Sequence, residues 1–185
     1  MSVLLDGSHL TVEKLVRIAR GGEAVELDTG ALERIRTNLR ESLVLWLAEG
    51  FGVWRVPVAP GTFGSVIGLL WFFVLLWAGD FWFFLAGTAL GMAASVWLCG
   101  AAERILKQTD PPSVVLDEIA AVPLCFVVWV STAWFRTRAL PSPESFFASQ
   151  HWLPTLIVFA LFRLFDILKP WPIRQSQKLP GGWGV

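Results

Sequence analysis

Long stretches without charge are the feature that most limits how this chain can fold. Residues 56–102 contain one formally charged side chain, Asp80, and residues 119–135 contain none. A helix crosses the hydrocarbon core of a bilayer with about 20 apolar residues. Charged residues make up 16% of the 185 residues, whereas soluble domains carry about 25%. The sequence therefore predicts an integral membrane protein.

Four apolar segments are long enough to be considered as membrane spans. They lie near residues 62–79, 81–100, 119–135 and 152–168. The first and last are short, so they need tilt or local thinning of the bilayer to cross it. The predicted fold class is all-α, a polytopic membrane helical bundle of about four spans formed by residues 42–185.

Residues 1–41 differ from the rest of the chain because they are polar. They predict two short amphipathic helices, the first capped by Thr11 and stopped by Gly21 and Gly22. The second is marked by apolar residues at helical spacing, namely Leu32, Ile35, Leu39 and Leu43.

Residues 5–36, LDGSHLTVEKLVRIARGGEAVELDTGALERIR, also resemble the N-terminal segment of aromatic amino-acid ammonia-lyases. The Ala-Ser-Gly cofactor triplet of that family does not occur in this sequence. The resemblance therefore implies no lyase activity, and we interpret the segment as a soluble cap or a fused fragment.

The basic residues predict which side of the membrane each end occupies. With four spans and a cytoplasmic N-terminus, residues 101–118 and 169–185 lie on the cytoplasmic side. That side then holds most of the cations outside the apolar segments, including Arg55, Arg104, Lys107, Lys169, Arg174 and Lys178. Arg136 and Arg138 lie on the other side, so the positive-inside rule favours this orientation. The balanced net charge gives no argument for nucleic-acid binding.

A glycine-rich stretch, APGTFGSVIG at residues 59–68, precedes the first apolar segment. Pro60 and Gly61 predict a turn, and Thr62 or Ser65 is placed to cap the helix that follows. The free N–H groups of a helix start suit an anion such as phosphate. The alternative is an ordinary helix cap with no ligand.

An acidic stretch, DPPSVVLDEIAAVPL at residues 110–124, opens the third apolar segment. Asp110 precedes two prolines, and Ser113 is placed to cap a helix that carries Asp117 and Glu118. Ionisable residues at membrane depth are costly and are candidates for function. Carboxylates suit Mg²⁺, which prefers oxygen ligands and bridges to substrate phosphates. The alternative is a solvated helix start.

The fourth apolar segment ends in RLFDILKPWPIR, residues 163–174. Arg163, Asp166 and Lys169 follow one another at i,i+3 spacing on a helix. Lys169 precedes a proline, which predicts the end of the helix there. Lys169 and Arg174 are suited to phosphate. The alternative is a set of snorkelling anchors, which does not explain the acid.

Taken together, these three motifs resemble the phosphatidylglycerophosphatase A family. The resemblance covers about residues 45–185, and it rests on Gly-Thr-Phe-Gly-Ser at 61–65, Asp117-Glu118 and the long motif at 163–174. It implies a Mg²⁺-dependent hydrolase that converts phosphatidylglycerophosphate to phosphatidylglycerol in phospholipid biosynthesis. It also implies a bacterial inner membrane location with the active site facing the cytoplasm.

The resemblance also implies roles for individual residues. The predicted metal ligands are Asp110, Asp117, Glu118 and Asp166. The predicted catalytic residues are Asp117, Glu118, Asp166 and Lys169. The predicted phosphate-binding residues are Thr62, Ser65, Arg163, Lys169 and Arg174. After a turn like that at residues 181–185, the family continues to an Asp-Asp pair and another apolar helix, and this sequence ends at Val185.

Two other functions are compatible with the sequence. Acids within apolar segments also mark ion paths, which allows a small transporter or ion-binding protein. A catalytically inactive, truncated fusion is the other alternative. Transporters tend to place their sites near the midplane and to show internal repeats. The charges here lie at one edge and no repeat is visible, so the sequence favours a lipid phosphatase.

Overall fold

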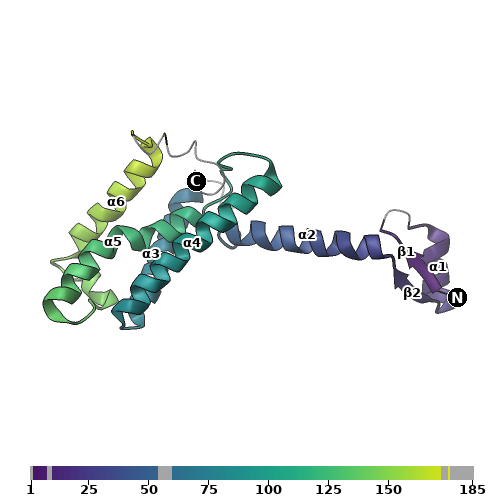
Figure 1. Cartoon of the computed structure of the whole chain (residues 1–185), viewed down its shortest axis with the longest axis horizontal. Helices are drawn as coiled ribbons and strands as arrows, with labels where there is room; N and C mark the ends of the chain where they lie inside the picture. The colour runs from purple at the N-terminus through teal and green to yellow at the C-terminus, as the bar shows by residue number, and fades with distance from the viewer. Residues whose placement is uncertain (1, 8–9, 54–59, 172–174, 176–185) are drawn as a thin grey trace. The chain divides into compact units, whose positions relative to one another are not determined.

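The computed structural model describes residues 2–7, 10–53, 60–171 and 175. Contacts between residues divide the chain into two compact units, Met1–Leu43 and Val44–Val185 (Figure 1). Helix α2 (Thr29–Ala48) begins in the first unit and ends in the second. Each unit is described by itself.

The first unit is a small βαβ arrangement that continues into α2. Strands β1 (Ser2–Leu5) and β2 (Ala24–Leu27) are parallel, and α1 (Val12–Gly21) connects them. The Thr11 hydroxyl accepts a hydrogen bond from Lys14 N, and Gly22 ends α1 in the left-handed conformation, as predicted. The two strands were not predicted, because four residues are too few to show a clear alternation.

A surface ion pair follows α1. Arg17 donates two hydrogen bonds to the Glu23 carboxylate, the shorter of 2.6 Å. These bonds hold the pKa of Glu23 below its ordinary value. Because both groups lie at the surface, this ion pair contributes little to the free energy of unfolding.

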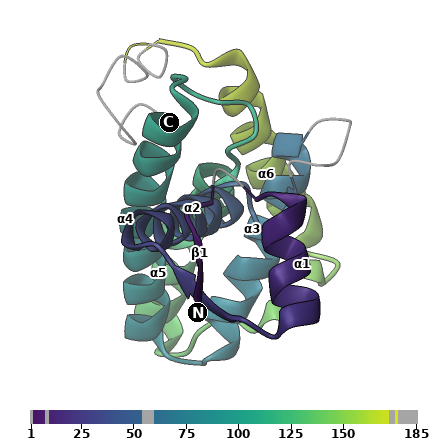
Figure 2. The same ribbon diagram turned by 90° about the vertical axis from the view of Figure 1, so that its right-hand side faces the viewer.

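The second unit is a bundle of helices (Figure 2). Its elements are α3 (Pro60–Trp77), α4 (Phe81–Leu106), α5 (Leu116–Thr137), the 3₁₀ helix η2 (Pro143–Phe147) and α6 (Trp152–Leu168). Helix α5 packs against α3, α4 and α6, which places it at the centre of the bundle. Helices α3 and α6, which carry predicted site residues, therefore both lie against α5.

Two helices in the described part of the chain, α4 and α5, are long and apolar enough to cross a membrane. The apolar part of α3, Gly61–Trp77, is shorter. The expectation of a mainly helical chain is confirmed, and these helices are consistent with a membrane protein. The number of spans stays a prediction.

An aromatic core fills the end of the bundle that lies away from the predicted site. Phe72 of α3 stacks on Phe126 of α5 with ring centroids 4.5 Å apart. Phe146 of η2 meets Phe72 edge-on at 5.2 Å. The Thr155 hydroxyl donates to Phe146 O at 3.2 Å, which ties α6 to η2. Aromatic pairs of this kind contribute beyond the area that they bury.

Glycines let α3 approach α5 closely. A Cβ added at Gly68 would lie 2.8 Å from Ile119 O, so only glycine fits there without a shift. Pro123 of α5 has no N–H to donate to that carbonyl four residues earlier. Because Gly68 has no side chain, the α3 backbone lies close to this carbonyl, which lacks its usual helical hydrogen bond. Such a contact is typical of closely packed membrane helices.

Three capping predictions are wrong. Helix α3 begins at Pro60, so Thr62 and Ser65 lie inside its first turns and are not caps. Proline suits the first turn of a helix, which explains the earlier start. Helix α5 follows Val115 without any side-chain cap, so Ser113 does not cap it. The predicted end of α6 is confirmed, since the helix stops at Leu168.

Candidate functional site

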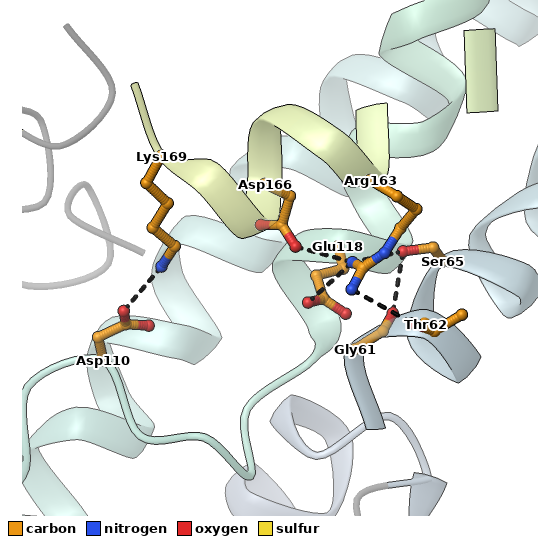
Figure 3. A network of polar contacts seen from close by, with 8 residues as sticks. All are labelled: Gly61, Thr62, Ser65, Asp110, Glu118, Arg163, Asp166 and Lys169. Carbon is orange, nitrogen blue, oxygen red and sulfur yellow. Dashed lines mark hydrogen bonds and ion pairs between the residues drawn. The ribbon is translucent and has the colours of Figure 1, made fainter. Parts of the chain in front are cut away.

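Residues of the three motifs lie close together in one polar network (Figure 3). The first turns of α3 contribute residues from the glycine-rich motif, and the start of α5 contributes the acids. The last turns of α6 contribute Arg163 and Asp166. Ser65 and Arg163 are 98 positions apart in sequence, and their side chains are in hydrogen-bond contact. Packing of α5 between α3 and α6 brings these segments together.

Arg163 is at the centre of this group. Its Nη1 donates to Asp166 Oδ2 at 2.7 Å, to Ser65 Oγ at 3.0 Å and to Glu118 Oε1 at 3.2 Å. Its Nη2 donates to Thr62 Oγ1 at 3.4 Å. The Arg163 side chain is only 13% exposed. One guanidinium therefore pairs with two carboxylates at a site largely removed from water, where an unpaired charge is costly.

A second ion pair lies beside the first. Lys169 Nζ donates to Asp110 Oδ2 at 2.9 Å, and both side chains are partly exposed. Both residues have positive φ angles, 42° for Lys169 and 50° for Asp110. The Asp110 N–H donates to Glu103 Oε1 at 2.9 Å, which ties the loop to α4. Strained backbone of this kind is often found at functional sites.

Three buried polar atoms have no hydrogen-bond partner among the described residues. They are Asp117 Oδ1, Glu118 Oε2 and Arg163 Nε. An unsatisfied buried polar atom costs free energy, so native proteins leave few of them. Two acceptors and one donor are thus left without a partner in this part of the bundle.

These atoms belong to residues that line a pocket of about 290 Å³. Its charged wall is formed by Asp110, Asp117, Glu118, Arg163, Asp166 and Lys169. Gly61, Pro111, Pro112, Val114 and Val115 complete the lining. The cations can hold an anion, and the carboxylates can hold a metal ion or accept a proton.

Glycines at the start of α3 make room for Glu118. A Cβ added at Gly61 would fall on the Glu118 carboxylate, and one at Gly64 would lie 2.8 Å from its Oε2. The two positions are three residues apart and share a helix face. Sequence reasoning linked this motif to phosphate and missed its contact with the acid. The Gly-x-x-Gly spacing was the available signal.

Comparison with known proteins identifies the family of this chain. The family description "Phosphatidylglycerophosphatase A" matches residues 46–185. The chain belongs to the phosphatidylglycerophosphatase A family. This confirms the resemblance found in the sequence and places the chain in a family of enzymes. The likeness of residues 5–36 to ammonia-lyases stays a prediction.

Three curated relatives share this part of the chain. A phosphatidylglycerophosphatase A of Haemophilus influenzae is 38% identical over 140 residues, covering 75% of each protein. One of Escherichia coli is 28% identical over 140 residues, 75% of this chain and 70% of the relative. A Bacteroides thetaiotaomicron protein, provisionally named phosphatidylinositol-3-phosphatase, is 31% identical over 77% of this chain and 82% of its own length. No solved structure matches the chain.

The structure places the predicted site residues in two groups. The residues that line the pocket of this phosphatidylglycerophosphatase A family member are Asp110, Asp117, Glu118, Arg163, Asp166 and Lys169. Thr62 and Ser65 do not line it, and their hydroxyls contact Arg163 instead. Ser65 is fully buried and also donates to Gly61 O at 2.9 Å. Arg174 lies outside the described residues.

Two acids of the pocket carry the kind of oxygen ligand that Mg²⁺ prefers. Within the described residues, no group of three or more His, Cys, Asp or Glu is arranged as a complete metal site. However, Asp117 and Glu118 each present a buried oxygen without a partner. Mg²⁺ is commonly bound through one or two carboxylates together with substrate phosphates. Two free carboxylate oxygens beside cations that can hold the phosphate satisfy that requirement.

Proposed function

We propose that this protein hydrolyses the terminal phosphomonoester of phosphatidylglycerophosphate to give phosphatidylglycerol and phosphate, as a step of phospholipid biosynthesis. Family membership and the names of two relatives support this substrate. The Bacteroides relative is named for another phosphorylated lipid, and the shared chemistry is a phosphomonoester on a lipid headgroup. The observation that carries the proposal is one pocket with a buried guanidinium and two unpaired acid oxygens.

The chain's cations hold the phosphate in this proposal. Arg163 lines the pocket and has a free Nε, and Lys169 lines it from the end of α6. Thr62 and Ser65 position the guanidinium by accepting its hydrogen bonds. A guanidinium fixed in this way is a preorganised partner for the charge on the transferring phosphoryl group.

In this proposal the acids hold a Mg²⁺ ion and accept the proton of the attacking water. Asp117 and Glu118 are the proposed ligands, because each has a buried oxygen without a partner. Asp166 pairs with Arg163, and Asp110 pairs with Lys169. When bound, Mg²⁺ neutralises charge on the phosphoryl oxygens and lowers the pKa of water. Water oxygen forms a bond to phosphorus as the ester P–O bond breaks. A pocket carboxylate accepts a proton from the water, and that proton then passes to the departing lipid oxygen, which leaves as a hydroxyl.

Phosphate release from lipid by the purified protein tests this function. In mixed micelles of detergent and phosphatidylglycerophosphate, we expect release with Mg²⁺ and none in excess chelator. Asp117→Asn lowers the rate by about 10²–10³-fold or more, because an acid that aids charge stabilisation is lost. The matched control is Glu144→Gln, an exposed residue of η2, which leaves the rate unchanged.

Two different outcomes would contradict different parts of the proposal. Full turnover in chelator would remove the metal assignment, whereas a wild-type protein that releases no phosphate from the lipid would remove the activity.

The proposed topology has four spans, formed by α3, α4, α5 and α6, with the site at the cytoplasmic face of the bacterial inner membrane. The predicted distribution of basic residues supports this orientation. Gln108→Cys and Ala139→Cys, in a background with Cys99 and Cys125 replaced by serine, place single thiols at exposed positions before and after α5. On intact spheroplasts, an impermeant thiol reagent labels position 139, and it labels position 108 only after permeabilisation. Labelling of both positions from outside would contradict a membrane-spanning α5.

A further inference from the structure

A second pocket of the same unit is apolar. It has a volume of about 300 Å³ and is lined only by apolar side chains and one glycine. Its walls come from the end of α2, from α3, from α4 and from the first turns of α5. This volume is at the lower end of the roughly 300–1,000 Å³ of small-ligand pockets.

The apolar pocket and the charged pocket share the first turns of α5. Asp117 and Glu118 line the charged pocket, whereas Leu116 and Ile119 line the apolar one. Successive residues of a helix point about 100° apart, so one turn can present acids to one side and apolar side chains to the other. The two pockets therefore lie on neighbouring sides of one helix turn.

The apolar pocket extends away from the charged end of the bundle. On α3, Gly61 lines the charged pocket and Trp71 lines the apolar one. Their separation of ten positions corresponds to about 15 Å along the helix axis. On α4, the lining runs from Leu98 back to Gly91, away from Glu103, which holds Asp110 at the site.

We propose that this apolar pocket holds one acyl chain of the phospholipid whose headgroup enters the charged pocket. This inference rests on the proposed function, because the headgroup phosphate defines which end of the lipid faces the acids. A single hydrocarbon chain suits a pocket of this volume, whereas a helix of a second protein copy is about 10–12 Å across. The charged pocket lies beside the apolar one at the first turns of α5, and this adjacency favours the substrate over any other lipid.

The acyl chain contributes orientation in this proposal. Lipid tails are as apolar as the pocket wall, so moving a chain from the bilayer into the pocket provides no hydrophobic driving force. Holding the chain instead fixes the lipid so that the phosphate meets the reacting groups, and misplacement lowers the rate strongly. The pocket therefore governs turnover of long-chain substrate and has no effect on a substrate too short to enter it.

Filling the pocket tests the proposal. Ala94→Phe places a ring in the pocket, and Ala93→Phe is the matched control at an exposed neighbour that does not line it. Gly91→Leu is a second filling variant, since its Cβ position lies 3.6 Å from Trp71 Nε1, an ordinary contact. The substrates are phosphatidylglycerophosphate with long chains and its dibutanoyl form, both in detergent.

We expect both filling variants to lower kcat/KM for the long-chain substrate by about tenfold or more. The dibutanoyl substrate is turned over at the wild-type rate, which also shows that the variants fold. Ala93→Phe changes neither rate. Three results would each overturn the proposal. They are wild-type rates on both substrates in the filling variants, equal losses on both substrates in those variants, and the same long-chain loss in Ala93→Phe.

A binding measurement separates this inference from the proposed function. Long-chain phosphatidylglycerophosphate with a photoreactive diazirine on one chain is irradiated with the protein, and the labelled peptides are identified. Label on residues 91–98 in the wild type and in Ala93→Phe, with loss in Ala94→Phe, supports the pocket even if the wild type releases no phosphate. Labelling that does not respond to Ala94→Phe would overturn the pocket and leave the phosphatase activity to be judged by phosphate release.

Discussion

Replacing Arg163 by methionine lowers phosphate release to below about 10⁻³ of the wild-type rate. It also lowers the midpoint temperature of thermal unfolding. Arg163 Nη1 is the shared partner of Glu118 and Asp166, at 3.2 and 2.7 Å. Methionine keeps much of the volume and leaves two carboxylates without their cation. Removing one partner of a buried ion pair costs about 3–5 kcal/mol, and the transferring phosphoryl group also loses a charge partner.

Rates in mixed micelles and thermal unfolding in the same detergent measure the two effects. Arg163→Lys keeps the charge and loses the planar fork, so it recovers most of the thermal midpoint and little of the activity. Arg136→Met, at an exposed position in the last turn of α5, is the matched control and changes neither quantity. An Arg163→Met protein with normal stability and turnover would show that the carboxylates are balanced by another group.

Replacing Gly61 by alanine lowers kcat/KM by about 10²-fold while the protein stays folded. The added Cβ falls on the Glu118 carboxylate, which has to move out of its place between α3 and Arg163. A misplacement of about 1 Å at a reacting group costs on this order. Alanine favours the helical conformation over glycine by about 1 kcal/mol, so the thermal midpoint does not fall in proportion to the activity.

A double-mutant cycle identifies the contact responsible. Glu118→Asp shortens the acid by one methylene, so the loss in Gly61→Ala, Glu118→Asp is smaller than the sum of the two single losses. Gly87→Ala is the control, because its Cβ meets only the end of the Leu75 side chain, far from the site. Additive losses in the cycle, or wild-type activity in Gly61→Ala, would show that Glu118 does not need its observed position.

The sequence was sufficient for features that depend on neighbouring residues. Apolar runs predicted the helices of the second unit, because the composition of one segment decides whether its own backbone favours a helix. Thr11 caps the start of α1 and Gly22 caps its end, as predicted, and Lys169 ends α6 beside its proline. The three motifs were also sufficient to find the family, since order and spacing are properties of the chain alone.

Contacts between distant segments were decided only by the tertiary structure. The sequence predicted that Thr62 and Ser65 bind phosphate. In the structure, their hydroxyls instead accept hydrogen bonds from Arg163 of α6. Sequence reasoning explained Gly61 as a turn former, whereas the approach of α5 makes Gly61 the space for an acid. The apolar pocket likewise exists only where four helices meet. A short polar side chain or a glycine has many compatible partners, and its local sequence does not say which helix face will lie opposite. That choice is made by how the apolar faces pack.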